Sequence, residues 1–242
     1  MLTCKILPIQ EGNIPLISQA LAVQTVNSLY ERSPPAHRHY VRAKLRFDPL
    51  TDELFALCRE AGPWGVLVDA GCGRGQFSVL MAQWGGVQSV WGFDHDLTKV
   101  RVASEATSAI EGGAFRYVQG DLREAPIPPS VDTVLLLDVL HYLSLEDQGK
   151  ILRRFSQVLR PGGRLVIRET GHGLGKGARF AAFFERWGRR LGFNRGEELA
   201  FRHSGELEEE LRALGLTVSR NAPRGALKNV LLVAQRPKLR PQ

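Results

Sequence analysis

Residues 66–77, Val-Leu-Val-Asp-Ala-Gly-Cys-Gly-Arg-Gly-Gln-Phe, decide the fold of this chain of 242 residues. The stretch predicts a buried strand that ends in Asp69, a glycine turn at 71–75, and the start of a helix. Such a turn lets a nucleoside-type ligand approach the backbone closely. A dinucleotide fingerprint has its third glycine one position later, where Gln76 stands, so the spacing disfavours a nicotinamide cofactor.

Three further apolar runs, residues 87–94, 114–122 and 131–138, each include an acid at or near the end. These acids are Asp94, Asp121 and Asp138. Successive parallel strands place their carboxyl ends at one edge of a sheet, so we expect the three acids to meet Asp69 in one crevice. Four carboxylates suit a cofactor that carries positive charge and repel a phosphate-bearing one. Any single acid could instead cap the helix that follows it.

In these features the sequence resembles the class I S-adenosylmethionine-dependent methyltransferases, whose first motif is an acid followed by Gly-x-Gly-x-Gly after the first strand. Residues 159–167, in which Pro-Gly-Gly turns from a helix into a fifth strand, also resemble that family. The resemblance is close over roughly residues 60–170. It implies a doubly wound α/β fold with a mostly parallel seven-stranded sheet, helices on both faces and an antiparallel last strand.

The resemblance implies a role in holding S-adenosylmethionine for each residue that matches the family pattern. Asp69 matches the acid that orients the methionine portion. Asp94, with His95 beside it, matches the acid that accepts both ribose hydroxyls. Asp121 and Leu122 match the pair that recognises the adenine. The other predicted cofactor residues belong to the turn, the end of the fourth strand and a basic segment upstream: Gly71, Cys72, Gly73, Gly75, Asp138, Lys44 and Arg46.

Residues 1–59 precede the core and are predicted to form a helical lid or substrate segment. Within them, residues 33–49 begin with a proline pair and are rich in basic side chains. The resemblance implies that Lys44 or Arg46 pairs with the methionine carboxylate and that Tyr40 reaches the methyl acceptor. The alternative is a solvated helix that packs on the sheet.

The predicted core spans residues 60–242 and contains a second lid at about residues 171–204. A glycine-rich hinge at 171–177 precedes a predicted helix at 179–193, which carries aromatic residues on one face and arginines on the other. The aromatic face favours an apolar acceptor. A helix packed on the core would show the same stripe.

His141 is the first candidate for a catalytic base. It follows the fourth strand, where the family places residues that face the reacting methyl group. Histidine titrates near neutral pH, so it can take a proton from an acceptor as the methyl arrives. The alternative is a histidine that only shapes the pocket. Tyr40 and the hinge residue His172 are further catalytic candidates.

The composition agrees with one α/β core, since 43% of the residues are hydrophobic. The three cysteines show no metal-ligand spacing, so no metal site is expected. No membrane span or signal peptide is predicted, and a cytoplasmic location follows from the reduced cysteines.

The formal net charge of +7 allows an RNA methyltransferase as an alternative. Residues 138–141 are Asp-Val-Leu-His, without the two prolines and the aromatic residue of base amino-group modifiers. The same basic surface would suit an acidic acyl-carrier protein or an anionic membrane surface. We therefore predict methyl transfer to a small or carrier-tethered, largely apolar acceptor, as in the small bacterial biosynthetic methyltransferases that the chain resembles. RNA methylation and a non-catalytic, cofactor-binding partner subunit are the alternatives.

Overall fold

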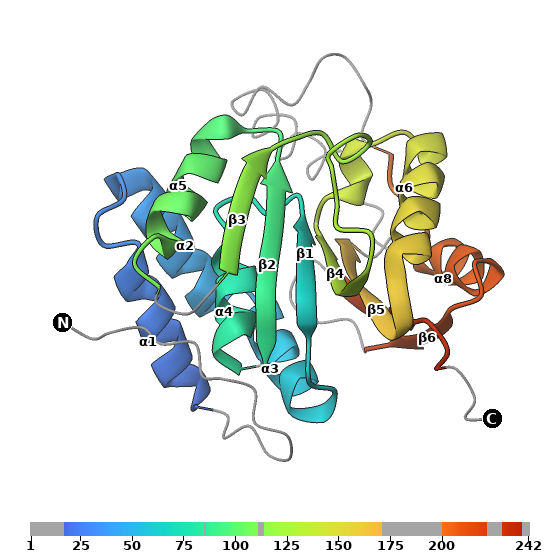
Figure 1. Ribbon diagram of the computed structural model, residues 1–242, viewed down its shortest axis with the longest axis horizontal. Helices are drawn as coiled ribbons and strands as arrows, with labels where there is room; N and C mark the ends of the chain where they lie inside the picture. The colour runs from blue at the N-terminus through green and yellow to red at the C-terminus, as the bar shows by residue number, and fades with distance from the viewer. Residues whose placement is uncertain (1–16, 85, 111–113, 171–199, 222–228, 239–242) are drawn as a thin grey trace, which may run out of the picture.

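A seven-stranded sheet forms the centre of the computed structural model, which describes residues 17–84, 86–110, 114–170, 200–221 and 229–238 (Figure 1). The strands are β1 (Gly65–Ala70), β2 (Val87–Asp94), β3 (Ala114–Gln119), β4 (Val131–Leu137), β5 (Leu159–Thr170), β6 (Thr217–Arg220) and β7 (Asn229–Gln235). Their order is β3-β2-β1-β4-β5-β7-β6. Strand β7 runs antiparallel to both of its neighbours, and the remaining pairs are parallel. The predicted doubly wound sheet with an antiparallel last strand is confirmed.

The strand order places a switch point between β1 and β4. From β1 the chain adds β2 and β3 on one side, and then returns to add β4 and β5 on the other. Where the order reverses, the connections leave the carboxyl ends of the two strands in opposite directions, and a crevice opens between them. The glycine turn after β1 and the segment after β4 therefore border the same crevice.

Helices cover both faces of the sheet because strand residues alternate between two apolar clusters. On β1, Leu67 belongs to one cluster and Val68 to the other. The first cluster is covered by α1 (Gln19–Leu29), α2 (Pro35–Phe47), α3 (Leu50–Glu60), α4 (Gln76–Trp84) and α5 (Leu97–Thr107). The second is covered by α6 (Leu145–Val158) and α8 (Ser204–Ala213), on the right in Figure 1.

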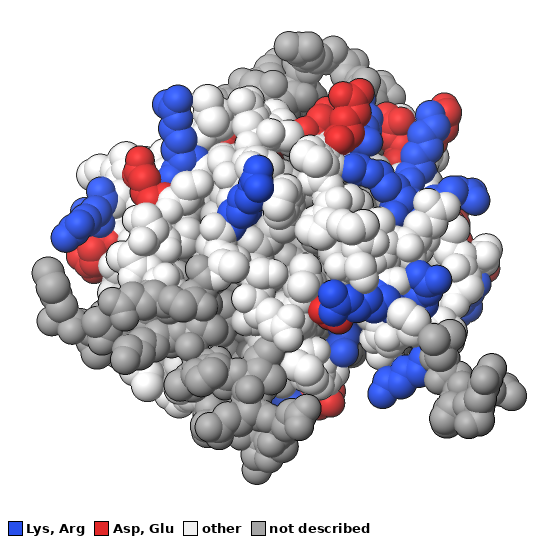
Figure 2. All heavy atoms as spheres, viewed as in Figure 1, with Lys and Arg blue, Asp and Glu red and all other residues white. Residues whose placement is uncertain are grey.

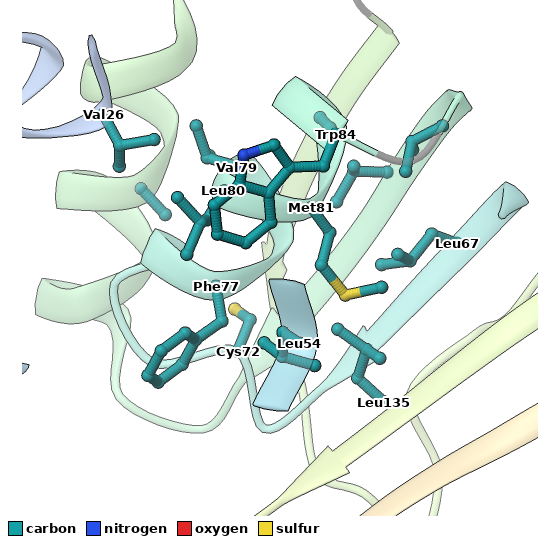
Figure 3. Close-up of a cluster of buried hydrophobic side chains, with 14 of the residues drawn as sticks. Val26, Leu54, Leu67, Cys72, Phe77, Val79, Leu80, Met81, Trp84 and Leu135 are labelled. Atoms are coloured by element: carbon teal, nitrogen blue, oxygen red, sulfur yellow. The ribbon is translucent and has the colours of Figure 1, made fainter. Parts of the chain in front are cut away.

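Helix α4 is buried along its whole length. It lies between the sheet on one side and α1 and α3 on the other, so the helix needs no polar face toward solvent. Figure 3 shows this arrangement, with Met81 near Leu67 and Leu135 of the strands and with Val26 and Leu54 contributed by the upstream helices. Because α4 begins directly after the glycine turn, this packing fixes the upstream helices close to that turn.

Two element boundaries differ from the prediction. Strand β3 ends at Gln119 rather than Leu122, because the backbone turns at Asp121, whose carbonyl accepts from Ala125 N at 2.7 Å. Strand β5 begins at Leu159, before the Pro-Gly-Gly turn, because Leu159 already pairs with Val131 of β4. The ladder then shifts register before it continues.

The predicted hinge at 171–177, the helix at 179–193 and the candidate His172 lie outside the described residues. The upstream residues 19–60 form α1, α2 and α3, and their action as a lid stays a proposal. Within the part of the chain that the structure describes, no helix is both long and apolar enough to cross a bilayer.

Candidate active site

The turn between β1 and α4 depends on three glycines with left-handed backbones: φ is +80° at Gly71, +55° at Gly73 and +73° at Gly75. A Cβ atom at Gly71 would lie 2.6 Å from Cγ2 of Val139, and one at Gly75 would lie 2.9 Å from the ring of Tyr117. At Gly73 a Cβ atom would meet nothing within 4 Å. The outer glycines thus allow tight packing, and the middle one leaves room for a ligand against the backbone.

Asp94 at the end of β2 fastens this turn. Its Oδ2 accepts from the Gly73 amide at 2.9 Å, and its Oδ1 accepts from the Asp96 amide at 2.9 Å. Burial would raise the pKa of Asp94, but hydrogen bonds from His95 and Asp96 and the charge of Lys99 lower it below its ordinary value. The carboxylate is therefore ionised. Its Oδ2 keeps a lone pair that a ligand hydroxyl could use, whereas Oδ1 already contacts both the Asp96 amide and, at 3.3 Å, Nδ1 of His95.

Asp69 lies at the end of β1 and is 4% exposed. Burial and the nearby charge of Asp94 raise the pKa of Asp69 to about 7, although a hydrogen bond from Ser78 lowers it. The carboxyl group is thus close to half-protonated at neutral pH. A ligand that brings positive charge or hydrogen-bond donors to the crevice would favour the ionised form.

Asp121 lies beyond the end of β3 and is turned toward solvent, with 40% of its side chain exposed. Arg123 holds it with two bonds, Nε–Oδ1 at 2.9 Å and Nη2–Oδ2 at 2.7 Å, and lowers its pKa. The next residue, Leu122, is buried in the second apolar cluster. Asp121 and Leu122 thus lie at the carboxyl ends of the strands, as expected, with the Asp121 side chain at the solvent-exposed rim of the crevice.

Asp138, directly after β4, belongs to a ring of four charged side chains. Its backbone is left-handed, with φ at +58°. Its carboxylate lies 3.1 Å from Nε of Arg168 and 3.6 Å from Nζ of Lys44. Both cations also contact Asp48, at 2.6 Å from Arg168 and 2.5 Å from Lys44. Acids and bases alternate around the ring, which ties the end of α2 to the ends of β4 and β5.

The charge argument made from the sequence needs a correction. Three of the four acids have cationic neighbours: Asp94 has Lys99, Asp121 has Arg123, and Asp138 has Arg168 and Lys44. The crevice is therefore not a set of mutually repelling carboxylates, and charge alone does not exclude a phosphate. The partners of Asp138 could not be found from spacing, because Asp138 and Lys44, for example, are 94 positions apart and meet only through the fold. Arg123 and Lys99 are two and five positions from Asp121 and Asp94.

Arg74, in the middle of the glycine turn, is held by the upstream helices. Its carbonyl accepts from the Tyr30 hydroxyl at 2.7 Å, and its Nε donates to Nδ1 of His37 at 2.8 Å. Its guanidinium lies 4.0 Å from the centre of the Tyr40 ring. Helices α1 and α2 thus contact the turn directly. The sequence pattern did not identify Tyr30, His37 or Arg74 as site residues.

The two basic residues predicted on α2 have different positions. Lys44 reaches the crevice, and the Asp138 and Asp48 carboxylates raise its pKa against the effect of burial, so it stays charged. Arg46 is exposed, with its guanidinium 5.4 Å from the Phe47 ring centre. Two residues along a helix correspond to a rotation of about 200°, so Arg46 projects from the opposite side of α2.

His141 is buried, with 1% of its surface exposed, in the short 3₁₀ helix η1 (Leu140–Tyr142). Its Nδ1 lies 2.7 Å from Oε2 of Glu169, whose Oε1 accepts from the Leu140 amide at 2.9 Å. The Phe201 ring stacks on the imidazole at 5.4 Å between centres. Burial would lower the pKa of His141, but the Glu169 carboxylate outweighs it and raises the pKa.

A hollow lies next to this histidine, between the sheet and the start of α8. His141 and Glu169 form its polar side, and the rest of its wall is mainly apolar, from residues that include Ile167, Phe201, Leu207, Val230 and Leu232. None of the four predicted acids lines it. The hollow is therefore separate from the crevice that the four acids border.

Two other features bear on the chemistry of the site. Cys72 in the turn is a free, buried thiol, and burial raises its pKa well above the ordinary value, so it stays protonated. Among the described residues, no group of three or more His, Cys, Asp or Glu side chains is placed to hold a metal ion.

Residues 68–167 match the methyltransferase domain family. This segment of the chain is therefore similar to a methyltransferase domain. It is 27% identical over 120 residues to an uncharacterized methyltransferase of Geobacillus sp. (strain WCH70), which covers 49% of this chain and 53% of that protein. It is also 34% identical over 103 residues to the 27-O-demethylrifamycin SV methyltransferase of Amycolatopsis mediterranei (strain S699). That match covers 42% of this chain and 37% of the relative. The chain spans about half the length of the first curated relatives that it matches.

The fold has a solved counterpart in the magnesium protoporphyrin IX methyltransferase of Synechocystis PCC 6803, which contains bound S-adenosylhomocysteine. The TM-score is 0.60 at 19% identity, and the match covers 90% of this chain and 95% of that one. The family match and the shared fold support the prediction of a class I methyltransferase fold. Methyl transfer and the use of S-adenosylmethionine by this chain stay proposals. The roles of individual site residues stay predictions.

We expect Asp69→Asn to stabilise the ligand-free methyltransferase domain above pH 7. In the wild type the unfolded carboxyl ionises near pH 4 and the folded one near pH 7, so stability falls across that interval and is constant above it. Asparagine cannot ionise, so the variant avoids this loss of unfolding free energy, which is about 2–4 kcal/mol. Thermal unfolding of both proteins at several pH values measures the difference. A gain that is equally large at pH 4 would contradict the assignment.

Replacing His37 with Gln should flatten the dependence of stability on pH on the acidic side. Burial and Arg74 lower the pKa of His37, so folding favours the neutral ring, and wild-type stability falls as the pH drops below about 6.5. A protonated ring cannot accept from Arg74, whereas the glutamine carbonyl can. His39→Gln, an exposed histidine on the same helix, is the control. Equal effects of the two variants would exclude a specific contact between His37 and Arg74.

Glu169→Gln should lower the pKa of His141 below the ordinary histidine value. Glutamine keeps an acceptor for the Leu140 amide but removes the negative charge, and burial then dominates. Nuclear magnetic resonance titration of the imidazole signals measures this pKa, with the exposed His39 as an internal reference. An unchanged His141 titration would mean that the ion pair does not form in solution.

Proposed function

We propose that this protein transfers a methyl group from S-adenosylmethionine to a small or carrier-tethered, largely apolar acceptor. One observation carries the proposal: the glycine turn at the sheet's switch point is joined to the ionised Asp94, with Asp69 buried beside it. The open space above Gly73 and the available lone pair on Oδ2 of Asp94 fit one ribose hydroxyl of a nucleoside, and the second hydroxyl would replace His95 at Oδ1. When bound, the cofactor supplies an electrophilic methyl group on a sulfonium.

The chain's own residues then bind and orient. Asp94 would hold the ribose, and Asp69, ionised by the approaching positive charge, would orient the methionine portion. Asp121 with the Leu122 amide would border the adenine at the rim. Lys44 already lies at the crevice with 27% of its side chain exposed, and could exchange part of its contact with Asp138 for the methionine carboxylate. Placement of this kind is the main requirement of methyl transfer, because sulfonium is a good leaving group.

The proposed acceptor class rests on the relatives. The curated relative and the solved structure are named for a rifamycin derivative and for magnesium protoporphyrin IX, which are small molecules rather than nucleic acids or proteins. The hollow beside His141 is too small to hold such an acceptor, so it does not bear on the acceptor class. The relatives favour a small acceptor.

For His141 the geometry favours the pocket-shaping alternative over the catalytic base. A raised pKa keeps more of the imidazole protonated at neutral pH, and a protonated ring cannot accept a proton. The Glu169 carboxylate bonds both the ring and the Leu140 amide, and so fixes the turn after β4. We therefore propose His141 as a positioning residue.

RNA methylation has less support. RNA binding calls for a broad basic surface with aromatic side chains on which bases stack. On the face shown in Figure 2, the basic side chains of the described residues are scattered, and several lie next to acidic ones. That face offers no continuous basic groove among the described residues.

Calorimetric titration with S-adenosylhomocysteine tests the cofactor site. We expect wild-type affinity near micromolar, reduced by at least about tenfold in Asp94→Asn and further in Asp94→Ala, because charge-assisted hydrogen bonds to the ribose are lost. Glu146→Ala, which removes an exposed acid on α6, is the matched control and should bind normally. Failure of the folded wild type to bind, or full affinity in Asp94→Ala, would overturn the proposal.

A further inference from the structure

Helix α2 carries a line of arginines on its outer side. Arg38, Arg42 and Arg46 are spaced four residues apart, which places them along one edge of a helix at intervals of about 6 Å. Arg42 and Arg46 are exposed, and Arg38 is partly exposed. We call these three residues the α2 arginine stripe.

The stripe has little compensating negative charge. Among the described residues, Glu31 is the acid that pairs with it, through a 2.7 Å contact to Arg42 in which both side chains are about half exposed. Arg38 donates to the Glu31 backbone carbonyl at 3.1 Å, which leaves its charge unneutralised. The contact described for Arg46 is with an aromatic ring. A surface ion pair of this kind contributes little to stability, so Arg42 can exchange Glu31 for an acid of a binding partner.

An exposed aromatic residue stands at the last position of α2, beside the stripe. Phe47 is 73% exposed and lies under the Arg46 guanidinium. One residue along a helix is a rotation of about 100°, so Phe47 lies to the side of the stripe that turns toward Lys44. Solvent-exposed phenylalanine next to arginine is a combination typical of the anchor points of protein interfaces. The stripe thus has an apolar side chain next to its last arginine.

The opposite side of the same helix faces the methyltransferase site. His37 and Tyr40 contact Arg74 of the glycine turn, and Lys44 contacts Asp138. Asp48, the residue after Phe47, bonds Arg168 in the charged ring. A partner bound along the α2 arginine stripe would therefore lie at the border of the crevice, with its anchor one residue from that ring.

We infer that the outer side of α2 docks an acidic acyl-carrier protein that presents the acceptor as a tethered acyl group. The inference rests on the proposed function, because it names how the acceptor arrives. A helix with acids four residues apart repeats its charge at the same interval of about 6 Å as the stripe, so two helices lying side by side match charge for charge. A single line of three arginines is narrower than the surface that RNA binding uses, which favours a protein partner.

Titration of the methyltransferase with a purified bacterial acyl-carrier protein, loaded with an octanoyl group, tests the inference. We expect binding that weakens as salt rises from low to physiological concentration. Arg42→Glu combined with Arg46→Glu should weaken it at least about tenfold, and Phe47→Ser should also weaken it. The matched control combines Arg101→Glu and Arg153→Glu, two exposed arginines on α5 and α6, with the same change in net charge. It should bind within about twofold of the wild type.

Parallel titration with S-adenosylhomocysteine separates the two proposals. The stripe variant should keep wild-type cofactor affinity, because Arg42 and Arg46 project from the side of α2 opposite Lys44. Phe47→Ser is compared only for carrier binding. A wild type that binds the cofactor but not the carrier protein would overturn the docking inference alone. Equal losses in the stripe variant and the control would also overturn it, as would tighter binding of a single-stranded RNA oligonucleotide or of anionic phospholipid vesicles. A wild type that does not bind the cofactor would instead overturn the proposed function.

Discussion

The bond between the Asp94 carboxylate and the Gly73 amide is the contact on which the rest of the site depends. It holds the middle glycine of the turn against the end of β2, where a Cβ atom would meet nothing within 4 Å and side-chain packing therefore fixes nothing. The amides of Gly71 and Cys72 secure the start of the turn by donating to the Phe93 carbonyl. Helix α4 starts from this turn and is buried throughout, so the position of the turn also sets the packing of α1 and α3. The crevice and the core are in this sense built from the same short segment.

The upstream helices reach the site by two routes with different chemistry. Arg74 connects the turn to α1 and α2 through hydrogen bonds and ring stacking, while the ring of Asp48, Lys44, Asp138 and Arg168 connects α2 to β4 and β5 through charge. Buried ion pairs contribute little net stability, because the cost of desolvation offsets the attraction, and they form only when the charged groups are accurately placed. The ring thus specifies where α2 lies more than it strengthens the fold.

The sequence was a good guide wherever a signal is local. Apolar runs that end in acids located the first four strands, the Pro-Gly-Gly turn located the fifth, and the glycine spacing located the turn after the first. The seven-stranded sheet was implied by the family resemblance and is confirmed. It was a poor guide to partners that meet only in three dimensions. Glu169 lies 28 positions from His141, and Arg74 lies 37 from His37, so no periodicity links them. The same limitation hid the cations beside Asp138, since Lys44 and Arg168 come from other elements. Lys99 and Arg123, by contrast, lie within five positions of Asp94 and Asp121, and the sequence analysis overlooked them as partners.

The left-handed backbone of Asp138 restricts which residues can occupy that position. A residue with a Cβ atom pays roughly 1–2 kcal/mol to adopt this conformation, and only asparagine, aspartate and glycine do so readily. The amide of Asp138, bonded to the Arg168 carbonyl at 2.9 Å, holds the conformation in place. Of the three tolerant residue types, aspartate alone can also complete the charged ring. Divergent sequences with this architecture should therefore keep an acid here or lose the ring altogether, so that substitution at this position becomes a marker for whether the N-terminal helices still close against the sheet.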